Sequence, residues 1–287
     1  MARVALALML AACGSAATTT PTTPTTPPPT SPSKADTGLA VGAPLLTPGE
    51  HMAYTLELQG VSLATLDLAV GEPTTLGGKP AIVVQSHAKA VGLVKMVANI
   101  DDTFTSWIDL ATGRPLRWST DEFATKTSDK ERTDVDFSKR AGATLPVTFH
   151  LNDAPPQPEP QRASLPDTWD FNSFLMALRT WDPPTGTVLV AEVMRSRFMW
   201  HVEMTMRGKS KQTTAIGTVM ARQLDGRTYK LDRNGARAPG SEERKFTIWV
   251  SDDDGRVPLK VTAKTDYGDI ALAISDYAPG TGRRLRD

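Results

Sequence analysis

The sequence has a single cysteine, Cys13, among its 287 residues. One cysteine excludes an internal disulfide framework and any zinc or iron–sulfur site built from several cysteines. The sequence also lacks a net charge, because Lys plus Arg and Asp plus Glu both number 32. A balanced charge gives no overall attraction to nucleic acid or to an anionic membrane surface. We therefore expect no nucleic-acid partner.

The familiar catalytic and nucleotide-binding motifs are missing as well. The sequence contains no G-x-S-x-G, G-x-x-x-x-G-K-[ST], G-x-G-x-x-G or H-E-x-x-H pattern. The four histidines are widely separated, which disfavours a metal site; they are His51, His87, His150 and His201. We therefore expect a protein that is not an enzyme, with no catalytic residue, no metal and no cofactor.

An acidic run, DDDG at residues 252–255, invites comparison with a calcium loop. An EF-hand loop places its oxygen ligands at alternating positions and ends in a glutamate. Here the acids are contiguous, and no such glutamate follows. Asp and Gly favour turns, so the run predicts a β-turn between two strands. Arg256 and Lys260 are candidates to pair with Asp252 or Asp253 across this hairpin.

The cysteine follows a short apolar run at the start of the chain. Arg3 provides a positive charge, and residues 4–12 form an apolar segment that is too short to span a bilayer and is typical of a secretory signal. The letters LAAC at its end resemble the lipobox of bacterial lipoproteins, where cleavage precedes an acylated cysteine. We expect a signal peptide at residues 1–12 and lipidation of Cys13. The alternative is an ordinary secretory signal with a stray cysteine.

A Thr/Pro-rich stretch comes next, and with Cys13 it makes up residues 13–47. Its low complexity cannot bury a core, and its prolines favour an extended conformation. Fatty acyl chains such as palmitate on the cysteine would anchor this tether and hold a folded domain off the membrane. Gly14, rather than aspartate, follows the cysteine, which in Gram-negative lipoproteins implies passage to the outer membrane. We therefore expect a lipid-anchored protein of the cell envelope, on the outer membrane and facing the periplasm.

Alternating apolar and polar residues dominate from residue 48 onward, as in half-buried strands. The stretch TLGGK contains a Gly-Gly pair typical of a hairpin turn. Residues 48–287 are therefore predicted to form a single β-rich domain. Its fold is mainly β, an antiparallel meander curled into a barrel or half-barrel, with one amphipathic helix packed on it. From residue 103 on, the candidate strands are 103–109, 115–122, 131–137, 145–151, 187–195, 198–206, 213–222, 227–232, 244–251, 257–265 and 268–276.

One segment has a helical period instead, and it predicts an amphipathic helix over residues 168–180. Asp167 or Asp170 can cap its start, and two prolines follow its end. If this helix closes a hollow sheet like a lid, its apolar stripe contacts a ligand; if it only plugs the sheet, the interior is filled. The candidate ligand-binding residues are therefore the members of the stripe: Phe171, Phe174, Leu175 and Leu178.

Methionines gather in the second half of the chain. Packing in the core is the simpler interpretation, and an adaptable apolar binding surface is the alternative. A curled sheet with an apolar concave face would be a natural receptacle for an acyl chain. The methionines concerned are Met194, Met199, Met204, Met206 and Met220.

Three stretches of the chain have a family likeness: the opening GEHMAYTLELQGVSLATLDLAV, the central DFNSFLMALRT and the closing FTIWVSDDDGRVPLKVTAKTDYGDIALAISDY. Together, within residues 48–278, they resemble an exported bacterial family called domain of unknown function 3108, although a second glycine near Ala64 is missing. The resemblance implies a secreted or lipid-anchored domain with a curled antiparallel sheet, similar to the half-barrel of envelope lipoprotein carriers, and no established catalytic residues. The most specific positions are Trp249, Ser251, Asp252, Arg256, Pro258, Lys260 and Gly268.

Two hypotheses about function remain open from the sequence. In the first, a lipid-anchored envelope protein without catalytic activity binds a lipid or other apolar ligand, or a partner protein of the envelope. In the second, a structural or assembly lipoprotein has a core filled by its own side chains and binds no ligand. A continuous apolar cavity under the helix would favour the first hypothesis, and a filled interior the second.

Overall fold

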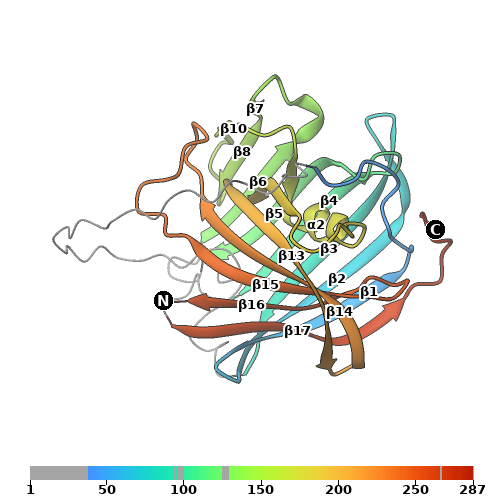
Figure 1. Ribbon diagram of the computed structural model, residues 1–287. Helices are drawn as coiled ribbons and strands as arrows, with labels where there is room; N and C mark the ends of the chain where they lie inside the picture. The colour runs from blue at the N-terminus through green and yellow to red at the C-terminus, as the bar shows by residue number, and fades with distance from the viewer. Residues whose placement is uncertain (1–37, 93–94, 96–99, 125–128, 266, 287) are drawn as a thin grey trace.

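The computed structural model describes residues 38–92, 95, 100–124, 129–265 and 267–286 (Figure 1). In this part of the chain, fifteen strands form one sheet, in the order β11-β12-β13-β14-β15-β16-β17-β1-β2-β3-β4-β5-β6-β8-β9. Their bounds are β1 Glu50–Leu58, β2 Val61–Leu76, β3 Lys79–Ala90, β4 Asp101–Asp109, β5 Pro115–Ala124, β6 Asp129–Asp136, β8 Val147–Leu151, β9 Gln157–Pro158, β11 Thr168–Asp170, β12 Val188–Arg195, β13 Phe198–Thr214, β14 Gly217–Lys230, β15 Arg244–Ser251, β16 Pro258–Thr265 and β17 Gly268–Pro279. Two short strands, β7 (Thr144–Leu145) and β10 (Gln161–Arg162), pair separately, and a 3-10 turn covers Phe137–Lys139.

The sheet is a meander whose two sequence ends meet. The first strand, β1, pairs on one side with β2 and on the other with the last strand, β17. The pairs between described strands are antiparallel except for β11 with β12, which is parallel. The sheet curls around one face without closing, and its edges are β11 and β9 (Figure 1). The predicted antiparallel meander in a half-barrel with one helix is thus confirmed.

The long hairpin of β13 and β14 differs from the prediction. The segment 213–222 was expected to be one strand, but the chain turns at residues 215–216 inside it. The alternation of QTTAIGTV runs through this turn without proline or an Asn-Gly pair, so the period-two pattern does not mark it. By contrast, the predicted Gly-Gly turn lies between β2 and β3, where both Gly77 and Gly78 have positive φ angles of 56° and 82°.

The helix α2 (Phe171–Leu178) lies against the concave face of the sheet (Figure 1). Of the two candidate caps, Asp170 is the N-cap: its carboxylate accepts from the backbone N–H of Ser173, whose hydroxyl in turn accepts from the N–H of Asp170. The helix is shorter than the predicted 168–180, because the cap residue is extended and residues 168–170 belong to β11. Its apolar side chains join two clusters of buried residues, so the helix fills the space between them.

Residues 38–47 lie against the domain, although the sequence assigns them to the tether. Leu39, Leu45 and Leu46 are buried, and the backbone N–H of Leu39 donates to the carboxylate of Asp167. These leucines follow the Thr/Pro-rich run and provide the apolar contact that the run itself lacks. The packed part of the chain therefore begins before residue 48.

Candidate functional site

Buried polar contacts fix the helix to the sheet. The hydroxyl of Ser106 in β4 donates to Asp170 at 2.5 Å, and that of Ser86 in β3 donates to the side-chain oxygen of Asn172 at 2.8 Å. The amide of Asn172 donates to the carbonyl oxygens of Val84 and Phe104. Because buried polar groups are costly unless paired, these contacts hold the helix in one position. Burial raises the pKa of Asp170 to about 6 despite the hydrogen bonds it accepts.

A buried ion pair fixes the end of the helix. The Arg179 guanidinium makes two hydrogen bonds to the Glu50 carboxylate, of 2.9 and 2.7 Å, and the two side chains are 2% and 1% exposed. The same guanidinium donates to the carbonyl of Gly255, and the hydroxyl of Tyr277 donates to Glu50. This arrangement joins β1, the helix end, the β15–β16 turn and β17, which are far apart in the sequence.

The four predicted ligand-binding residues lie at the core. Phe174, Leu175 and Leu178 are buried, and Phe171 is partly buried. The cavity beside the helix, next to Met176 and Ala177 among others, measures about 10 Å³, which is room for about one water molecule. No ligand contact of the stripe has been tested, so its role in binding stays a prediction. Cys13 lies outside the described residues.

Each of the four histidines contacts a neighbouring side chain. His51, His87 and His150 each contact one aspartate, and His201 stacks on Tyr229. Within the described ranges, no group of three or more His, Cys, Asp or Glu side chains is placed to hold a metal ion. Likewise, none of the helices described is both long and apolar enough to cross a membrane.

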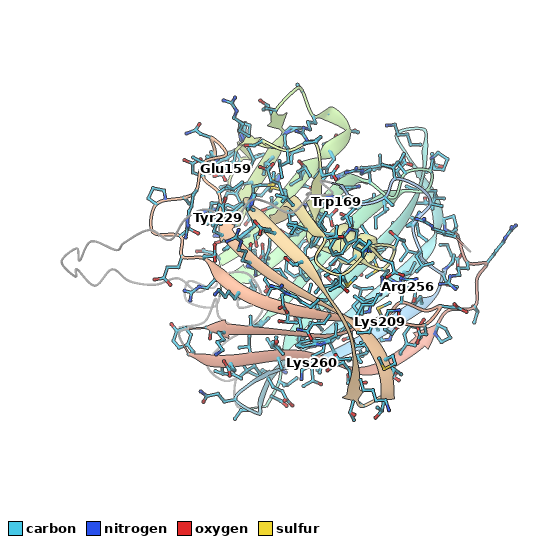
Figure 2. All side chains as sticks on the ribbon, viewed as in Figure 1. Glu159, Trp169, Lys209, Tyr229, Arg256 and Lys260 are labelled. Atoms are coloured by element: carbon cyan, nitrogen blue, oxygen red, sulfur yellow. The ribbon has the colours of Figure 1, made fainter. Side chains whose placement is uncertain are left out.

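The acidic run forms the predicted turn between β15 and β16, but its ion pairs differ from those expected. Asp253 accepts from the hydroxyl of Ser251 and the backbone N–H of Arg256. The side chain of Arg256 pairs with Asp182 at 2.9 Å, and Asp252 pairs with Lys209 of β13 at 2.7 Å. Figure 2 labels the two cations, Arg256 and Lys209. Lys260 instead lies over the ring of Trp249. The prediction of hairpin pairs was therefore wrong, because partners from other elements approach the turn.

Most of the methionine cluster belongs to the core. Met194, Met199, Met204 and Met206 are buried, whereas Met220 is 41% exposed on the β13–β14 hairpin. Gap-filling by flexible thioether side chains accounts for the four buried methionines.

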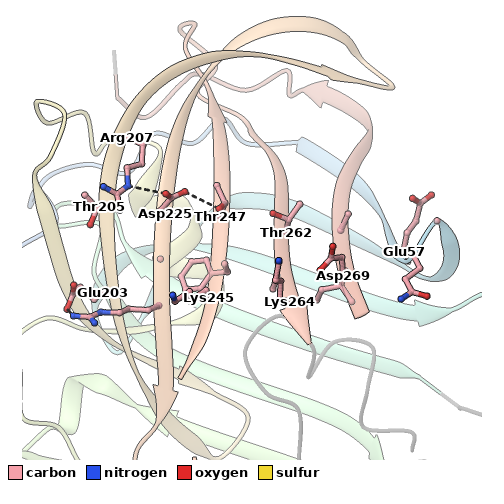
Figure 3. A pocket seen from close by; sticks show the side chains of 18 residues that line it. Glu57, Glu203, Thr205, Arg207, Asp225, Lys245, Thr247, Thr262, Lys264 and Asp269 are labelled. Carbon is pink, nitrogen blue, oxygen red and sulfur yellow. Dashed lines mark hydrogen bonds and ion pairs between the residues drawn. The ribbon is translucent and has the colours of Figure 1, made fainter. Parts of the chain in front are cut away.

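A groove of about 1180 Å³ lies on the face of the sheet opposite the core, across β13 to β17 and β1 (Figure 3). Strand alternation separates the two faces: in β15, Phe246 and Ile248 are buried, whereas Lys245 and Thr247 point into the groove. Strands lie about 4.8 Å apart, so six strands give the groove a length of roughly 24 Å.

The register of the strands arranges the groove side chains in two rows. The first row mixes hydroxyls and acids, and the second carries a run of cations with an acid at each end. In the first row the order is Thr205, Asp225, Thr247, Thr262, Ala271 and Glu57. In the second row it is Glu203, Arg227, Lys245, Lys264 and Asp269.

The first row is held by local hydrogen bonds. Asp225 accepts from the guanidinium of Arg207 at 3.0 Å, from the hydroxyl of Thr247 at 3.0 Å and from the amide of Gln223 at 3.0 Å. Partial burial raises the pKa of Asp225, but these three donors outweigh it and lower the pKa below its usual value. The carboxylate is therefore ionised and fixed at neutral pH.

Two of the three cations in the second row have no ion pair with the described residues. The third, Arg227, pairs with Glu203 at 2.7 Å and with Glu243 at 3.7 Å, and the hydrogen bond to Glu203 raises its pKa. Lys245 and Lys264 are exposed and have no ion pair or hydrogen bond with the described residues. Arg227 and Lys245 are directly opposed across β14 and β15, and like charges in such pairs are destabilising. An unfavourable pair of like charges is a feature that proteins retain at functional sites. The row of cations therefore makes the groove a candidate site.

Comparison with known proteins identifies the family. The sequence profile described as "Protein of unknown function (DUF3108)" matches residues 52–275. The chain belongs to the DUF3108 family. No curated protein sequence matches it significantly. The resemblance noted in the opening strands, the central helix and the closing hairpin is thus confirmed.

Three solved structures are similar to this DUF3108 chain to different degrees. A β-barrel-like protein of the DUF1849 family from Brucella abortus has a TM-score of 0.50 at 10% identity, with 83% of this chain and 99% of that one covered. A candidate lipoprotein from Parabacteroides distasonis has a TM-score of 0.39 at 6% identity, with 83% and 99% covered. A candidate exported protein with a YmcC-like fold from Bacteroides fragilis has a TM-score of 0.38 at 4% identity, with 83% and 100% covered. The Brucella protein supports the half-barrel fold and nothing beyond it.

A second polar cluster in the DUF3108 domain lies on the core side of β4 and β5. The carboxyl of Asp102 accepts from the backbone N–H of Phe123, and that of Glu122 accepts from the hydroxyl of Ser196 at 2.6 Å. Burial raises the pKa of Asp102 to about 7 and raises that of Glu122, while Arg195 opposes both shifts. This carboxyl pair therefore makes stability depend on pH.

Asp102→Asn is expected to stabilise the domain at pH 8 but not at pH 4. Because the pKa of Asp102 is raised on folding, its protonation favours the folded state at low pH, and that contribution is lost as pH rises from about 4 to 7. The uncharged amide avoids the loss, which we put at about 1–2 kcal/mol for a partly exposed group. Urea unfolding of both proteins at the two pH values measures it. Equal stability differences at pH 4 and pH 8 would contradict the assignment.

The sequence did not reveal the groove. Each lining residue is an ordinary polar position of an alternating strand, as in RKFTIWVS of β15. The sequence did contain one indication of the groove: Lys245 and Lys264 both occupy polar-face positions, in the neighbouring strands β15 and β16. Their proximity depends on the register of β15 with β16, which a single sequence does not specify.

Proposed function

We propose that this DUF3108 protein is a non-catalytic, lipid-anchored protein of the bacterial cell envelope that binds an extended segment of a partner protein in the groove across β13 to β17 and β1. The observation that carries the proposal is the row in which Lys245 and Lys264 stand unpaired beside Arg227. A ligand of opposite charge would form favourable interactions with these cations and offset their mutual repulsion.

The chemistry of the groove supports a polypeptide over other ligands. Apart from Ala271, the side chains of its two rows are polar or charged, so the rows offer little apolar surface for an acyl chain. Polyanions such as nucleic acid need an excess of cations, but four acidic and four basic residues line the groove: Glu57, Glu203, Asp225 and Asp269 with Arg207, Arg227, Lys245 and Lys264. A polypeptide can carry both signs in a matching order.

The anchor and location rest on the sequence of the N-terminus. A lipidated Cys13 followed by the Thr/Pro-rich run would hold the groove at a distance from the membrane and expose it to periplasmic proteins. The outer membrane is the proposed site of attachment because Gly14 follows the cysteine. The partner is accordingly an envelope protein.

Cys13→Ala is expected to move the protein from the membrane fraction to the soluble periplasm, because the acyl attachment point is lost. Cell fractionation followed by immunoblotting measures the distribution. A Thr18→Ala variant in the same stretch serves as the control and should stay in the membrane fraction. If wild type and Cys13→Ala both partition into the periplasm, the anchor is disproved.

Site-specific photo-crosslinking in living cells tests the groove itself. A photoreactive residue at Thr262, within the groove, should give one discrete adduct with an envelope protein. The same residue at Gln85, which is exposed on the outer face of β3 away from the groove, should give none of that adduct. Adducts of equal yield at the two positions, or none from Thr262, would overturn the proposal.

A further inference from the structure

The middle of the groove has the composition of an anion-binding position. Lys245 and Lys264 come from β15 and β16, each one position beyond the paired Phe246 and Ala263, and both line the groove. Thr247 and Thr262 are directly paired on the same two strands and provide hydroxyl groups in the adjacent row. The two ammonium groups and the Thr262 hydroxyl can donate hydrogen bonds to a carboxylate, whereas the Thr247 hydroxyl already donates to Asp225.

The two ends of the same row carry the opposite sign. Glu203 lies at the β13 end and Asp269 at the β17 end, so the row reads acid, Arg227, Lys245, Lys264, acid. Glu203 is already paired with Arg227, whereas Asp269 is exposed and has no side-chain partner among the described residues. A long polyanion would meet repulsion at both ends, while a ligand with an acidic centre and basic flanks would not.

We propose that the partner segment is an extended peptide whose centre carries acidic side chains that bind Lys245 and Lys264, with a basic residue toward Asp269. This inference rests on the groove being the binding site proposed above, and it adds the charge order of the ligand. The roughly 24 Å length of the groove fits about seven extended residues at about 3.4 Å each. Alternate side chains of such a peptide face the same row, so two or three acidic groups can reach the cations.

The cations of the second row come from three neighbouring strands. Arg227 and Lys245 face each other directly, and Lys264 extends the same sign to the next strand. Lys245→Glu replaces a like charge opposite Arg227 by an opposite one, whereas Lys264→Glu places a like charge opposite Asp269. The two effects oppose each other, so reversing both lysines should leave the domain folded, with a melting temperature close to that of the wild type. This expectation distinguishes a binding role from a structural one, because replacing residues that are needed for folding would lower the melting temperature.

Selection from a random dodecapeptide library displayed on phage tests the charge order. Against the wild-type domain, acidic residues should be enriched at the centre of the selected peptides. Against Lys245→Glu/Lys264→Glu, basic residues should replace them, and the affinity for the wild-type peptides should fall about tenfold or more. Lys79→Glu/Lys89→Glu, which makes the same change in net charge on β3 outside the groove, should select the same peptides as the wild type.

The outcomes separate this inference from the groove proposal. If peptides selected by the wild type have no central acidic preference, or if the glutamate variant selects the same peptides, the charge order is wrong while groove binding stands. If no peptide is enriched over a library passed through beads alone, and Thr262 gives no crosslink, both proposals fall. Enrichment of acidic peptides that also bind the β3 variant and the groove variant equally would show binding by net charge only and overturn the inference.

Discussion

Arg179→Met is expected to lower the free energy of unfolding by about 3–5 kcal/mol, because it leaves the Glu50 carboxylate buried without its counter-ion. Both side chains are almost fully buried, and two hydrogen bonds join them. The hydroxyl of Tyr277 remains as a donor, but it is neutral and cannot replace the guanidinium. Guanidinium chloride unfolding of the two proteins at pH 7 measures the difference.

Two controls make this result specific. In Glu50→Gln/Arg179→Met neither charge is left, so much of the lost stability should return. Arg132→Met removes a guanidinium that is 48% exposed beside Asp134 and should cost less than about 1 kcal/mol. The buried pair would lose its assigned role if Arg179→Met were no more destabilising than Arg132→Met.

Phe174→Ala is expected to lower the free energy of unfolding by about 3–5 kcal/mol as well. Phe174 is 7% exposed and packs in the cluster that contains Trp169 and Leu178, so its removal leaves a cavity in the core. A helix that acted as a lid over a ligand cavity would behave differently: the same change would cost less stability but would weaken uptake of an apolar probe.

Denaturant unfolding and fluorescent fatty-acid binding, run on the wild type and on Phe174→Ala, distinguish the two roles of the helix. Met220→Ala, on the exposed end of the β13–β14 hairpin, is the matched control and should change stability little. The packed interior would be contradicted if the wild type bound the probe saturably and Phe174→Ala lost this binding with only a small change in stability. The helix would then be interpreted as a lid over a ligand cavity.

Sequence patterns that span only a few residues predicted the elements that interactions between near neighbours determine. The stripe at i, i+3, i+4 and i+7 indicated α2, and Asp170 was one of two caps that the sequence offered. The Gly-Gly pair indicated the turn between β2 and β3 because positive φ angles favour glycine. The contiguous acids at 252–254, followed by Gly255, indicated a turn, which the structure confirms.

Contacts between parts of the chain that are distant in sequence could not be predicted from a single sequence. Glu50 and Arg179 are 129 positions apart, and neither stands in a motif. The partners of the acidic turn, Lys209 and Asp182, come from a hairpin and a connection that the strand pattern does not bring together. The groove depends on the register of six strands, and a shift by one residue would turn its lysines toward the core.

Amide hydrogen exchange of the folded domain, with and without the partner segment recovered by crosslinking at Thr262, tests the central claim most directly. Binding in the groove should slow exchange in β14, β15 and β16, where the cations of the second row lie, and leave β3, β4 and β5 unchanged. Slower exchange confined to β3–β5 or to the helix, or no change at a saturating concentration of the segment, would contradict the groove as the binding site.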